Sequence, residues 1–341
     1  MNLAWQELSA ANDVTCSPMH PIAAASPVLD PTIGIVVCIP SYRRAQLLRM
    51  TLRSLAGQRT RRRFAVVVVE NDAAERTSVA VASDVLRLQD LMGLCVVEPR
   101  QGNCHAINAA FEMALAAFPQ AAHFLMIDDD EVASPDWLER MLRAAETSGA
   151  DIVGGPVWAK FDEDEKRGLR DHPAFRPAYD ASGPVPMIYG CGNCLIRRHV
   201  FTRLGLPAFD LRFNFLGGGD TDFFARCRAA GMRFYWAADA VITESVPRSR
   251  TSPAWLALRG LRIGAINYHV QRRLADDVGS QLRLIAKLVA LLPFSLFRAM
   301  CLALTSRKAL IALHPIIVAT GSALAAFGFE PQPYKASKII S

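Results

Sequence analysis

Ile127-Asp128-Asp129-Asp130-Glu131 is the stretch of the chain that decides its fold. These four consecutive acids end the apolar run His123-Phe124-Leu125-Met126-Ile127, and an apolar run bounded by charge predicts a buried strand. The carboxylates then lie at the carboxyl end of the strand, where open α/β sheets bind ligands. Adjacent carboxylates raise each other's pKa unless a cation compensates them, and hard oxygen ligands suit Mg²⁺ or Mn²⁺.

The same acids allow a second interpretation, in which they form a solvated turn before the next helix. Ser134 is a suitable N-cap residue for that helix, and Pro135 is a suitable first residue. This motif alone leaves both interpretations open.

Around the acidic stretch, apolar strand-length segments alternate with amphipathic helix-length segments. Strands are expected at 33–39, 64–69, 94–98, 123–127 and 151–157, and helices at about 44–57, 75–90, 104–117 and 135–148. This alternation predicts an α/β fold with a mainly parallel, Rossmann-like sheet covered by helices on both faces. Residues 1–32, which are rich in Pro, Ala and Ser, are expected to form a flexible lead outside it.

Composition narrows the classes of protein. The chain has 341 residues, 51% of them hydrophobic, and a net charge of +6. Residues 259–308 carry nine Lys and Arg against only Asp276 and Asp277, and basic residues beside apolar sequence favour an anionic membrane surface. No nucleic-acid-binding signature accompanies them, so nucleic acid is not expected as a partner. Cysteines inside apolar runs indicate free thiols in a reducing compartment.

Two strongly apolar segments, 282–304 and 309–329, follow. The second has 21 residues without a formal charge, which is long enough to cross a bilayer, although His314-Pro315 would kink it. The first carries Arg283, Lys287 and Arg298, which favours a helix lying in the membrane plane. A crossing hairpin would also place Arg307 and Lys308 outside the cytoplasm, against the positive-inside tendency. A buried helical pair of a soluble protein or oligomer is the alternative.

Four motifs in order resemble the inverting glycosyltransferases of family 2, which have the GT-A fold. They are Val37-Cys38-Ile39-Pro40-Ser41-Tyr42-Arg43-Arg44, Val69-Glu70-Asn71-Asp72, Asp128-Asp129-Asp130 and Gly219-Asp220-Thr221-Asp222. In detail they most resemble glucosyltransferases that build succinoglycan-type exopolysaccharides on a lipid carrier. The resemblance covers about residues 33–250. It implies a nucleotide-sugar half at 33–157 and an acceptor half at 158–250, followed by a helical, membrane-associating region at 251–341.

The resemblance also implies roles for individual residues. The nucleotide-sugar-binding set is Pro40, Ser41, Tyr42, Arg43, Glu70, Asp72, Asn108, Asp128 and Asp129. The acceptor-binding set is Gly192, Asn193, Gly218, Gly219 and Asp222. Asp128 and Asp130 would hold Mg²⁺ or Mn²⁺, which stabilises the leaving diphosphate.

Asp220 is the expected catalytic base, because the acceptor hydroxyl must lose a proton as it attacks the sugar. A single base in line with the leaving group gives inversion at the sugar carbon. The alternative role for Asp220 is the N-cap of helix 221–231, which it could fill at the same time. Arg248 or Arg250 would reach a diphosphate or an anionic acceptor carrier, or would be plain surface residues. Cys191 and Cys194 have redox-like spacing but lack the strand-to-helix context of a redox motif.

Three departures from the family pattern affect these roles. Gly219 stands where relatives usually have Glu, Ile107 where they have Arg, and Thr243 where they have His. The last change would leave a metal one ligand short, with Glu244 or water as substitutes. None of the changes touches Asp128, Asp130 or Asp220.

The sequence therefore predicts an enzyme that transfers a hexose, with UDP-glucose as the favoured donor, to a lipid-linked oligosaccharide in exopolysaccharide synthesis. Its expected place is the cytoplasmic face of a bacterial inner membrane, beside other assembly enzymes. A non-catalytic nucleotide-sugar-binding subunit is the competing interpretation, because of the three departures. A nucleotidyltransferase would share paired metal carboxylates, but no Lys- and Gly-rich triphosphate loop follows the first strand.

Overall fold

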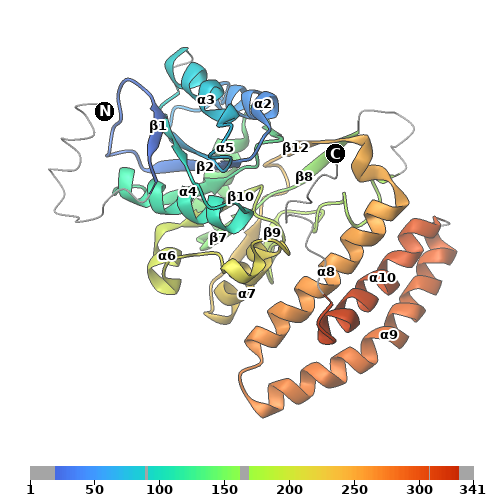
Figure 1. Ribbon diagram of the computed structural model, residues 1–341. Coiled ribbons are helices and arrows are strands. Elements are labelled where there is room, and N and C mark those ends of the chain that lie inside the picture. The colour runs from blue at the N-terminus through green and yellow to red at the C-terminus, as the bar shows by residue number, and fades with distance from the viewer. Residues whose placement is uncertain (1–19, 89–90, 162–168, 307, 330–341) are drawn as a thin grey trace.

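A computed structural model describes residues 20–88, 91–161, 169–306 and 308–329 of the chain. It contains a nine-stranded sheet with helices on both faces and three long helices beside it (Figure 1). In spatial order the strands are β1 (Ile22–Ala25), β4 (Gly93–Val97), β3 (Ala65–Glu70), β2 (Ile35–Ser41), β5 (His123–Met126), β10 (Cys194–Arg197), β7 (Ile152–Gly154), β11 (Phe234–Trp236) and β9 (Gly183–Val185). Strands β4, β3, β2 and β5 are parallel, whereas β10 is antiparallel to both of its neighbours. This architecture confirms the predicted α/β class.

Each face of the sheet has its own core. Helices α2 (Ala45–Ala56), α3 (Thr77–Leu88) and α5 (Trp137–Ser148) pack with Val37 on one face. Helices α4 (Asn103–Ala117), α6 (Arg198–Leu204) and α7 (Gly219–Ala229) pack with Val36 on the other. Because successive strand residues point to opposite faces, a strand buried on both sides is apolar without interruption. That continuous pattern is why the sequence located the parallel strands β2, β3, β4 and β5, and the helices α2 to α5, to within a few residues.

The expected strand 151–157 is divided in two. It ends as β7 at Gly154, and β8 (Val157–Phe161) leaves to form a second sheet with β12 (Ile242–Val246) and β6 (Glu131–Ala133). Pro156, which lacks a backbone N–H, separates the two strands. At Gly155 a Cβ atom would lie 2.6 Å from the Ala240 carbonyl oxygen. The sequence predicted neither this division nor β6.

The prediction that residues 1–32 form a flexible lead is wrong for residues 20–32. Strand β1 pairs antiparallel with β4, and His20 is buried. The two ring nitrogens of His20 lie 3.2 Å from Glu98 and 3.3 Å from Glu112. An Ala-rich strand gives no periodic signal in the sequence, but here it satisfies the exposed backbone edge of β4. Residues 1–19 lie outside the described residues.

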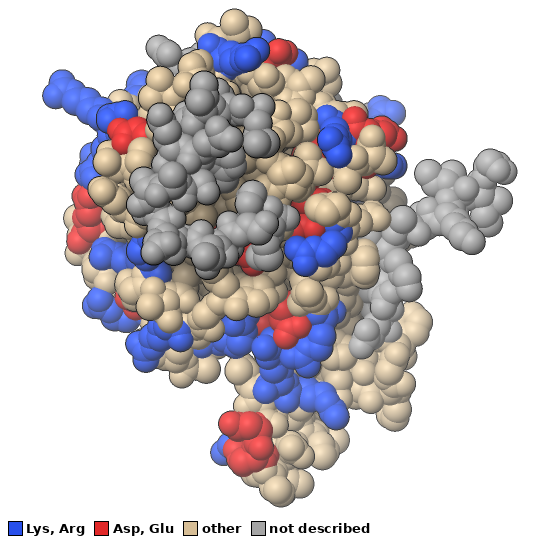
Figure 2. All heavy atoms as spheres, turned by 60° about the vertical axis from the view of Figure 1, so that its left-hand side comes forward, with Lys and Arg blue, Asp and Glu red and all other residues tan. Residues whose placement is uncertain are grey.

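The short 3-10 helix η2 (Leu211–Phe213) lies between α6 and α7, and another, η3 (Arg248–Thr251), lies between β12 and the first of the C-terminal helices. On the face shown in Figure 2, basic and acidic side chains are interspersed in small groups over the sheet domain.

Three helices complete the chain: α8 (Pro253–Leu274), α9 (Val278–Ser306) and α10 (Ala309–Ala326). Helix α8 approaches α10 closely, because a Cβ atom on Gly264 would lie 2.0 Å from the Val318 carbonyl oxygen. The Ser322 hydroxyl donates to the Gly264 carbonyl at 2.8 Å. Both α9 and α10 are long and apolar enough to cross a membrane. Only 11% of the apolar window of α9 is buried, against 39% for α10, so α9 is not a core helix of this chain.

Candidate active site

The carboxyl ends of three parallel strands bring the predicted motifs together. Strand β2 pairs with β3 up to Ser41 and Glu70, and with β5 up to Cys38 and Met126. The segments that follow these strands therefore meet at one edge of the sheet (Figure 1). This is the edge at which open α/β sheets bind ligands.

Asp129 fastens the segment after β2 to the end of β5. Its carboxylate accepts hydrogen bonds from the Ser41 hydroxyl at 2.9 Å and from the Tyr42 backbone N–H at 3.2 Å. Arg44 donates to the other carboxylate oxygen at 3.1 Å. Only 4% of Asp129 is exposed. Asp129 thus positions this segment, and its contact with a nucleotide sugar stays a prediction.

Asp130 lies between two arginines. Arg44 Nη1 donates to its carboxylate at 2.7 Å, and Arg250 Nη1 is 3.7 Å away. Arg250 also donates to Glu244 at 2.7 Å. The two guanidinium groups partly neutralise the acidic cluster, so Arg250 is not a plain surface residue. The sequence analysis included Arg44 in the first motif but assigned it no role in the site.

Asp128 is the open carboxylate of the cluster. Its backbone N–H donates to Glu131 Oε2 at 2.8 Å, but within the described residues its own carboxylate accepts no hydrogen bond. Burial, together with the charges of Asp130 and Asp129, raises the pKa of Asp128 to about 8. Asp128 therefore favours the protonated form at neutral pH unless a cation joins it.

Glu131 is a fourth acid of the site, and sequence reasoning assigned it no role. It is buried, and burial together with the charge of Asp128 raises its pKa well above the usual value. A Cβ atom on Gly192 would lie 2.5 Å from Glu131 Oε1, so the glycine leaves room for this carboxylate. The predicted acceptor contact of Gly192 stays a prediction.

The interpretation of the acids as a solvated helix cap is wrong. Asp129, Asp130 and Glu131 are buried, and Glu131 is the first residue of β6. Helix α5 begins later, at Trp137, and its N-cap residue is Asp136 rather than Ser134.

The acidic cluster fits a divalent cation at Asp128 and Asp130. Among the described residues no group of three or more His, Cys, Asp or Glu side chains is arranged as a metal site. However, the open carboxylate of Asp128, with its raised pKa, lies beside Asp130. Two such oxygen donors match the way Mg²⁺ is held by one or two carboxylates together with substrate phosphates.

The nucleotide loop after β2 has an unusual backbone. Arg43 has a φ of 55°, a left-handed conformation that costs a non-glycine residue about 1–3 kcal/mol and that clusters at functional sites. Its Nε donates to Asp72 at 2.5 Å, and its guanidinium lies 5.2 Å from the centre of the Tyr42 ring. Burial raises the pKa of Asp72, but the hydrogen bonds from Arg43, Glu75 and Ala74 together outweigh it, so the pKa is lowered. An exposed aromatic ring and a cation thus stand together at the sheet edge. Pro40 is buried within β2.

Two other residues of the predicted nucleotide set make structural contacts. Glu70 accepts from the backbone N–H groups of Asp72 and Ser78, at 2.8 and 2.7 Å, and so shapes the turn before α3. Asn108 uses both amide atoms on the backbone of Phe209, each at 2.8 Å. Nucleotide contacts by Glu70 and Asn108 stay predictions, and for Asn108 they would compete with these bonds.

Asp220 lies in the first turn of α7. Its Oδ1 accepts from the Thr221 backbone N–H at 2.7 Å, and within the described residues Oδ2 accepts no hydrogen bond. Oδ2 faces Gly190, 4.0 Å from where a Cβ atom on that glycine would be. Burial raises the pKa of Asp220, while hydrogen bonds from Thr221 and the charge of Arg262 oppose this rise. The N-cap alternative is wrong, because Gly218 holds that position.

The glycines before Asp220 allow close packing. Gly218 has a φ of 86°, and a Cβ atom there would lie 2.4 Å from Ile266 of α8. At Gly219 a Cβ atom would lie 2.8 Å from Cys104 Sγ, so this structure has no room for the glutamate that relatives carry. Acceptor contacts by Gly218 and Gly219 stay predictions.

The other two departures have simple structural explanations. Ile107 is completely buried in the core. The Thr243 hydroxyl donates to the Val132 carbonyl at 3.4 Å. Because strand residues alternate between faces, Thr243 and Glu244 point to opposite sides of β12, and Glu244 is the one that interacts with Asp130.

Two residues of the predicted acceptor set are engaged within the protein. The carboxylate of Asp222 accepts from Arg226 at 2.8 Å and from Arg273 at 2.8 Å, and it is 1% exposed. The Asn193 amide accepts from the Trp137 indole N–H and donates to the carbonyls of Pro156 and Ala240. Asn193 thus joins α5 to the segments that precede β8 and β12, and both acceptor contacts stay predictions.

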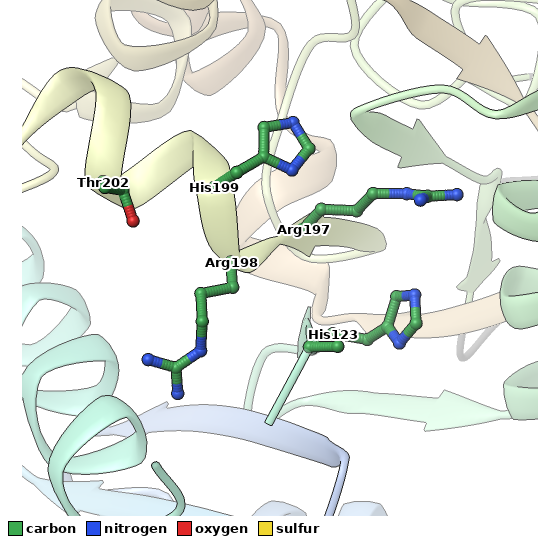
Figure 3. Close-up of a pocket in the computed structure, with 6 residues that line it drawn as sticks. His123, Arg197, Arg198, His199 and Thr202 are labelled. Carbon is green, nitrogen blue, oxygen red and sulfur yellow. The ribbon is translucent and has the colours of Figure 1, made fainter. Parts of the chain in front are cut away.

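Other polar groups lie away from this centre. Cys191 and Cys194 are free and buried, and burial raises the pKa of each thiol well above the usual value. A pocket of about 380 Å³ lies at the start of β5, at the opposite end of that strand from Asp128. In it Arg197 and Arg198 point in different directions (Figure 3). Arg198 donates to the Ala121 carbonyl and so has a structural role.

The fold is of the GT-A type. A mannosyltransferase from Pyrobaculum calidifontis, PcManGT, solved with GDP-Man and Mn²⁺, superposes with a TM-score of 0.57 at 20% identity, covering 89% of this chain and 90% of that one. S. aureus TarS 1–349, solved with UDP, gives 0.50 at 15% identity, covering 87% and 92%.

The family model "Glycosyl transferase family 2" matches residues 36–205, and "Glycosyl transferase family group 2" matches residues 123–326. Succinoglycan biosynthesis protein ExoM of Rhizobium meliloti is 35% identical over 237 residues, which are 68% of this chain and 74% of that protein. Glycosyltransferase AglE of Haloferax volcanii is 22% identical over 208 residues, which are 61% and 65% of the two chains. The chain therefore belongs to glycosyltransferase family 2 and is an enzyme related to ExoM.

Proposed function

We propose that the protein is an inverting hexosyltransferase that uses Asp220 as its base. The observation that carries the proposal is the state of this carboxylate, which has one oxygen held by Thr221 and the other facing Gly190 without a hydrogen bond from the described residues. An acceptor hydroxyl that enters beside Gly190 would meet this oxygen. The raised pKa of Asp220 makes it a stronger base than an exposed aspartate.

The donor would bind at the sheet edge formed by β2, β3 and β5. Tyr42, Arg43 and Asp72 stand together there and suit a nucleoside and its phosphates, with Ser41 and Asp129 holding the loop in shape. Asp128 and Asp130 would hold Mg²⁺ or Mn²⁺, which supplies positive charge for the departing diphosphate when bound. Arg44 and Arg250 keep this cluster compensated from the protein side.

We further propose UDP-glucose as the donor and a lipid-linked oligosaccharide as the acceptor, in exopolysaccharide synthesis at the cytoplasmic face of a bacterial inner membrane. The relation to ExoM supports the pathway, and the two apolar C-terminal helices support attachment to the membrane surface. Other enzymes of polysaccharide assembly would then be neighbours of the protein.

Incubation of the purified protein with nucleotide sugars and membrane extract tests the proposal. Labelled sugar should appear in extracted lipid with one UDP-hexose and with Mn²⁺ or Mg²⁺ present. Asp220→Asn should abolish this incorporation, whereas Asp239→Asn, a change at an exposed carboxylate, should not. If no nucleotide sugar is turned over while UDP still binds, the chain is a nucleotide-sugar-binding subunit. The observation that favours this second function is that Cys104 occupies the space in which a side chain at Gly219 would lie.

A further inference from the structure

Helix α9 presents three distinct faces along its length. One face packs toward α8 and α10, and its partly or fully buried residues recur at helical spacing: Leu284, Leu288, Leu291, Ser295, Ala299 and Leu302. The remaining surface is exposed. All three basic side chains lie on one side of the packed face, where the exposed Phe294 lies among them, and a run of large apolar side chains lies on the other side.

The apolar side of α9 is continuous. Its members are Leu282, Ile285, Val289, Leu292, Leu296 and Met300, which are 62%, 58%, 72%, 42%, 57% and 57% exposed. At about 100° per residue, these positions fall within an arc of about 80°. Such a run of exposed large apolar side chains marks an interaction surface rather than an ordinary part of a soluble surface. We call these six residues the apolar stripe.

The basic side of α9 carries Arg283, Lys287 and Arg298, which are all exposed. The same helical geometry places them within an arc of about 60°, on the other side of the packed face from the apolar stripe. Helix α9 contains no acidic residue. A surface with an apolar stripe and a row of cations matches a bilayer that contains anionic phospholipids.

Both ends of the helical group are fastened to the catalytic half. Near the end of α8, Arg273 lies 2.7 Å from Asp210 and 2.8 Å from Asp222. Just after α9, the Lys308 ammonium lies 2.7 Å from Asp171. Helix α9, which is about 43 Å long at 1.5 Å per residue, therefore begins and ends beside the same domain. A crossing helix would instead place its two ends on opposite sides of a core about 30 Å thick.

The charges of α9 also favour a helix that lies in the membrane plane. Arg283 and Arg298 are 15 residues apart, or about 22 Å along the helix, with Lys287 between them. A helix crossing the bilayer would place at least one of these cations in the hydrocarbon core, which is costly. In the membrane plane all three reach the lipid phosphates.

We propose that α9 is an in-plane docking surface for anionic phospholipid membranes, with the apolar stripe in the acyl boundary and the basic row at the headgroups. Helix α8 links this surface to the site, because Ile266 packs against Gly218 at the start of α7. If the proposed function holds, docking keeps Asp220 at the membrane surface, where a lipid-linked acceptor is reached without leaving the bilayer.

Flotation of the full-length protein with phosphatidylcholine vesicles, with and without phosphatidylglycerol, tests the surface. The wild type should float, and phosphatidylglycerol should increase binding. Val289→Asp combined with Leu296→Asp should lower vesicle binding at least tenfold. The matched control, Val28→Asp combined with Leu88→Asp, changes two exposed apolar residues outside the helical group and should bind as the wild type does.

Arg283→Gln, Lys287→Gln and Arg298→Gln combined should remove the preference for phosphatidylglycerol, a loss on the order of tenfold to a hundredfold. Stripe variants that float like the wild type overturn the proposal. So does a lipid-free wild-type dimer that the stripe variant converts to a monomer, because the stripe would then bind a second copy. Asp220→Asn should float as the wild type does. A wild type that floats but transfers no sugar refutes the proposed function and not the docking surface.

Labelling of the two ends of α9 separates in-plane attachment from crossing. Gly279→Cys and Thr305→Cys, each in a Cys16→Ser, Cys301→Ser background, place one reactive thiol at either end. In spheroplasts and inside-out vesicles, a membrane-impermeant maleimide should reach both positions from the same side. Labelling from opposite sides shows that α9 crosses the membrane and overturns the proposal.

Discussion

The acids after β5 and the acids at the start of α7 form two regions, and each contains one hydrogen-bonded carboxylate and one open carboxylate. After β5, Asp129 is fixed by the loop after β2, while Asp128 keeps an open carboxylate. In α7, Asp222 is fixed by two arginines, while Asp220 keeps one open oxygen. Each region therefore uses one carboxylate to hold the structure and leaves another accessible for chemistry.

The regions differ in how their charge is balanced. The cluster after β5 holds several carboxylates against Arg44 and Arg250, and the pKa values of Asp128 and Glu131 are raised. For Asp220, burial is the main cause of the raised pKa. A crowded acidic cluster suits a divalent cation, whereas a carboxylate whose pKa is raised mainly by burial suits proton transfer.

The largest effect is expected at the open acid of α7. Asp220→Asn should keep the fold and UDP binding but lower transfer by about 10²–10⁴-fold, because general-base assistance has that size and an amide cannot accept the proton. Initial rates with labelled donor measure the loss. A variant within threefold of the wild type would move the base elsewhere. The wild-type rate should also fall as the pH drops through the raised pKa of Asp220.

The fixed acid of α7 should act on stability instead. Asp222→Ala leaves Arg226 and Arg273 without their shared carboxylate, and removing one partner of a buried ion pair costs about 3–5 kcal/mol. Because both arginine side chains keep some exposure, we expect about 2 kcal/mol. Urea unfolding measures the loss, and donor affinity serves as the control. An unchanged urea midpoint would show that the ion pairs of Asp222 do not stabilise the fold.

The cluster after β5 should respond to metal. UDP affinity should drop about tenfold or more when a chelator removes Mg²⁺ or Mn²⁺, and a similar drop should follow Asp130→Ala in the presence of metal. Titration calorimetry measures both. Equal UDP affinity with and without chelator would mean that Arg44 and Arg250 bind the diphosphate without a metal ion.

The last effect is expected at Asp128, and its size depends on pH. The folded-state pKa of about 8 is above the ordinary value of about 3.9, so the folded protein binds this proton more tightly than the unfolded chain does. Stability is therefore lost as the pH rises from about 4 through about 8. With a chelator present, Asp128→Asn should raise the melting temperature at pH 8 more than at pH 5. An equal shift at both pH values would contradict the raised pKa.

The sequence predicted most of the sheet because its strands are buried on both faces. The continuous apolar runs before Asp128 and Glu70 located β5 and β3, and the helical periods between them located the flanking helices. It missed β1, because four Ala-rich residues at a sheet edge carry no pattern. It also missed β6, because the acid Glu131 begins this strand.

Sequence alone determined the family, the α/β class and the list of acids from which the site is built, because these follow from local composition and from motifs in a fixed order. Only the tertiary structure decided which acids are open. Asp128 and Asp129 are neighbours in the chain, and Asp220 and Asp222 are separated by one residue, yet the members of each pair meet different partners. Those partners, such as Tyr42 and Arg273, come from distant segments. The chemical state of a carboxylate depends on what surrounds it in space, which residue spacing does not reveal.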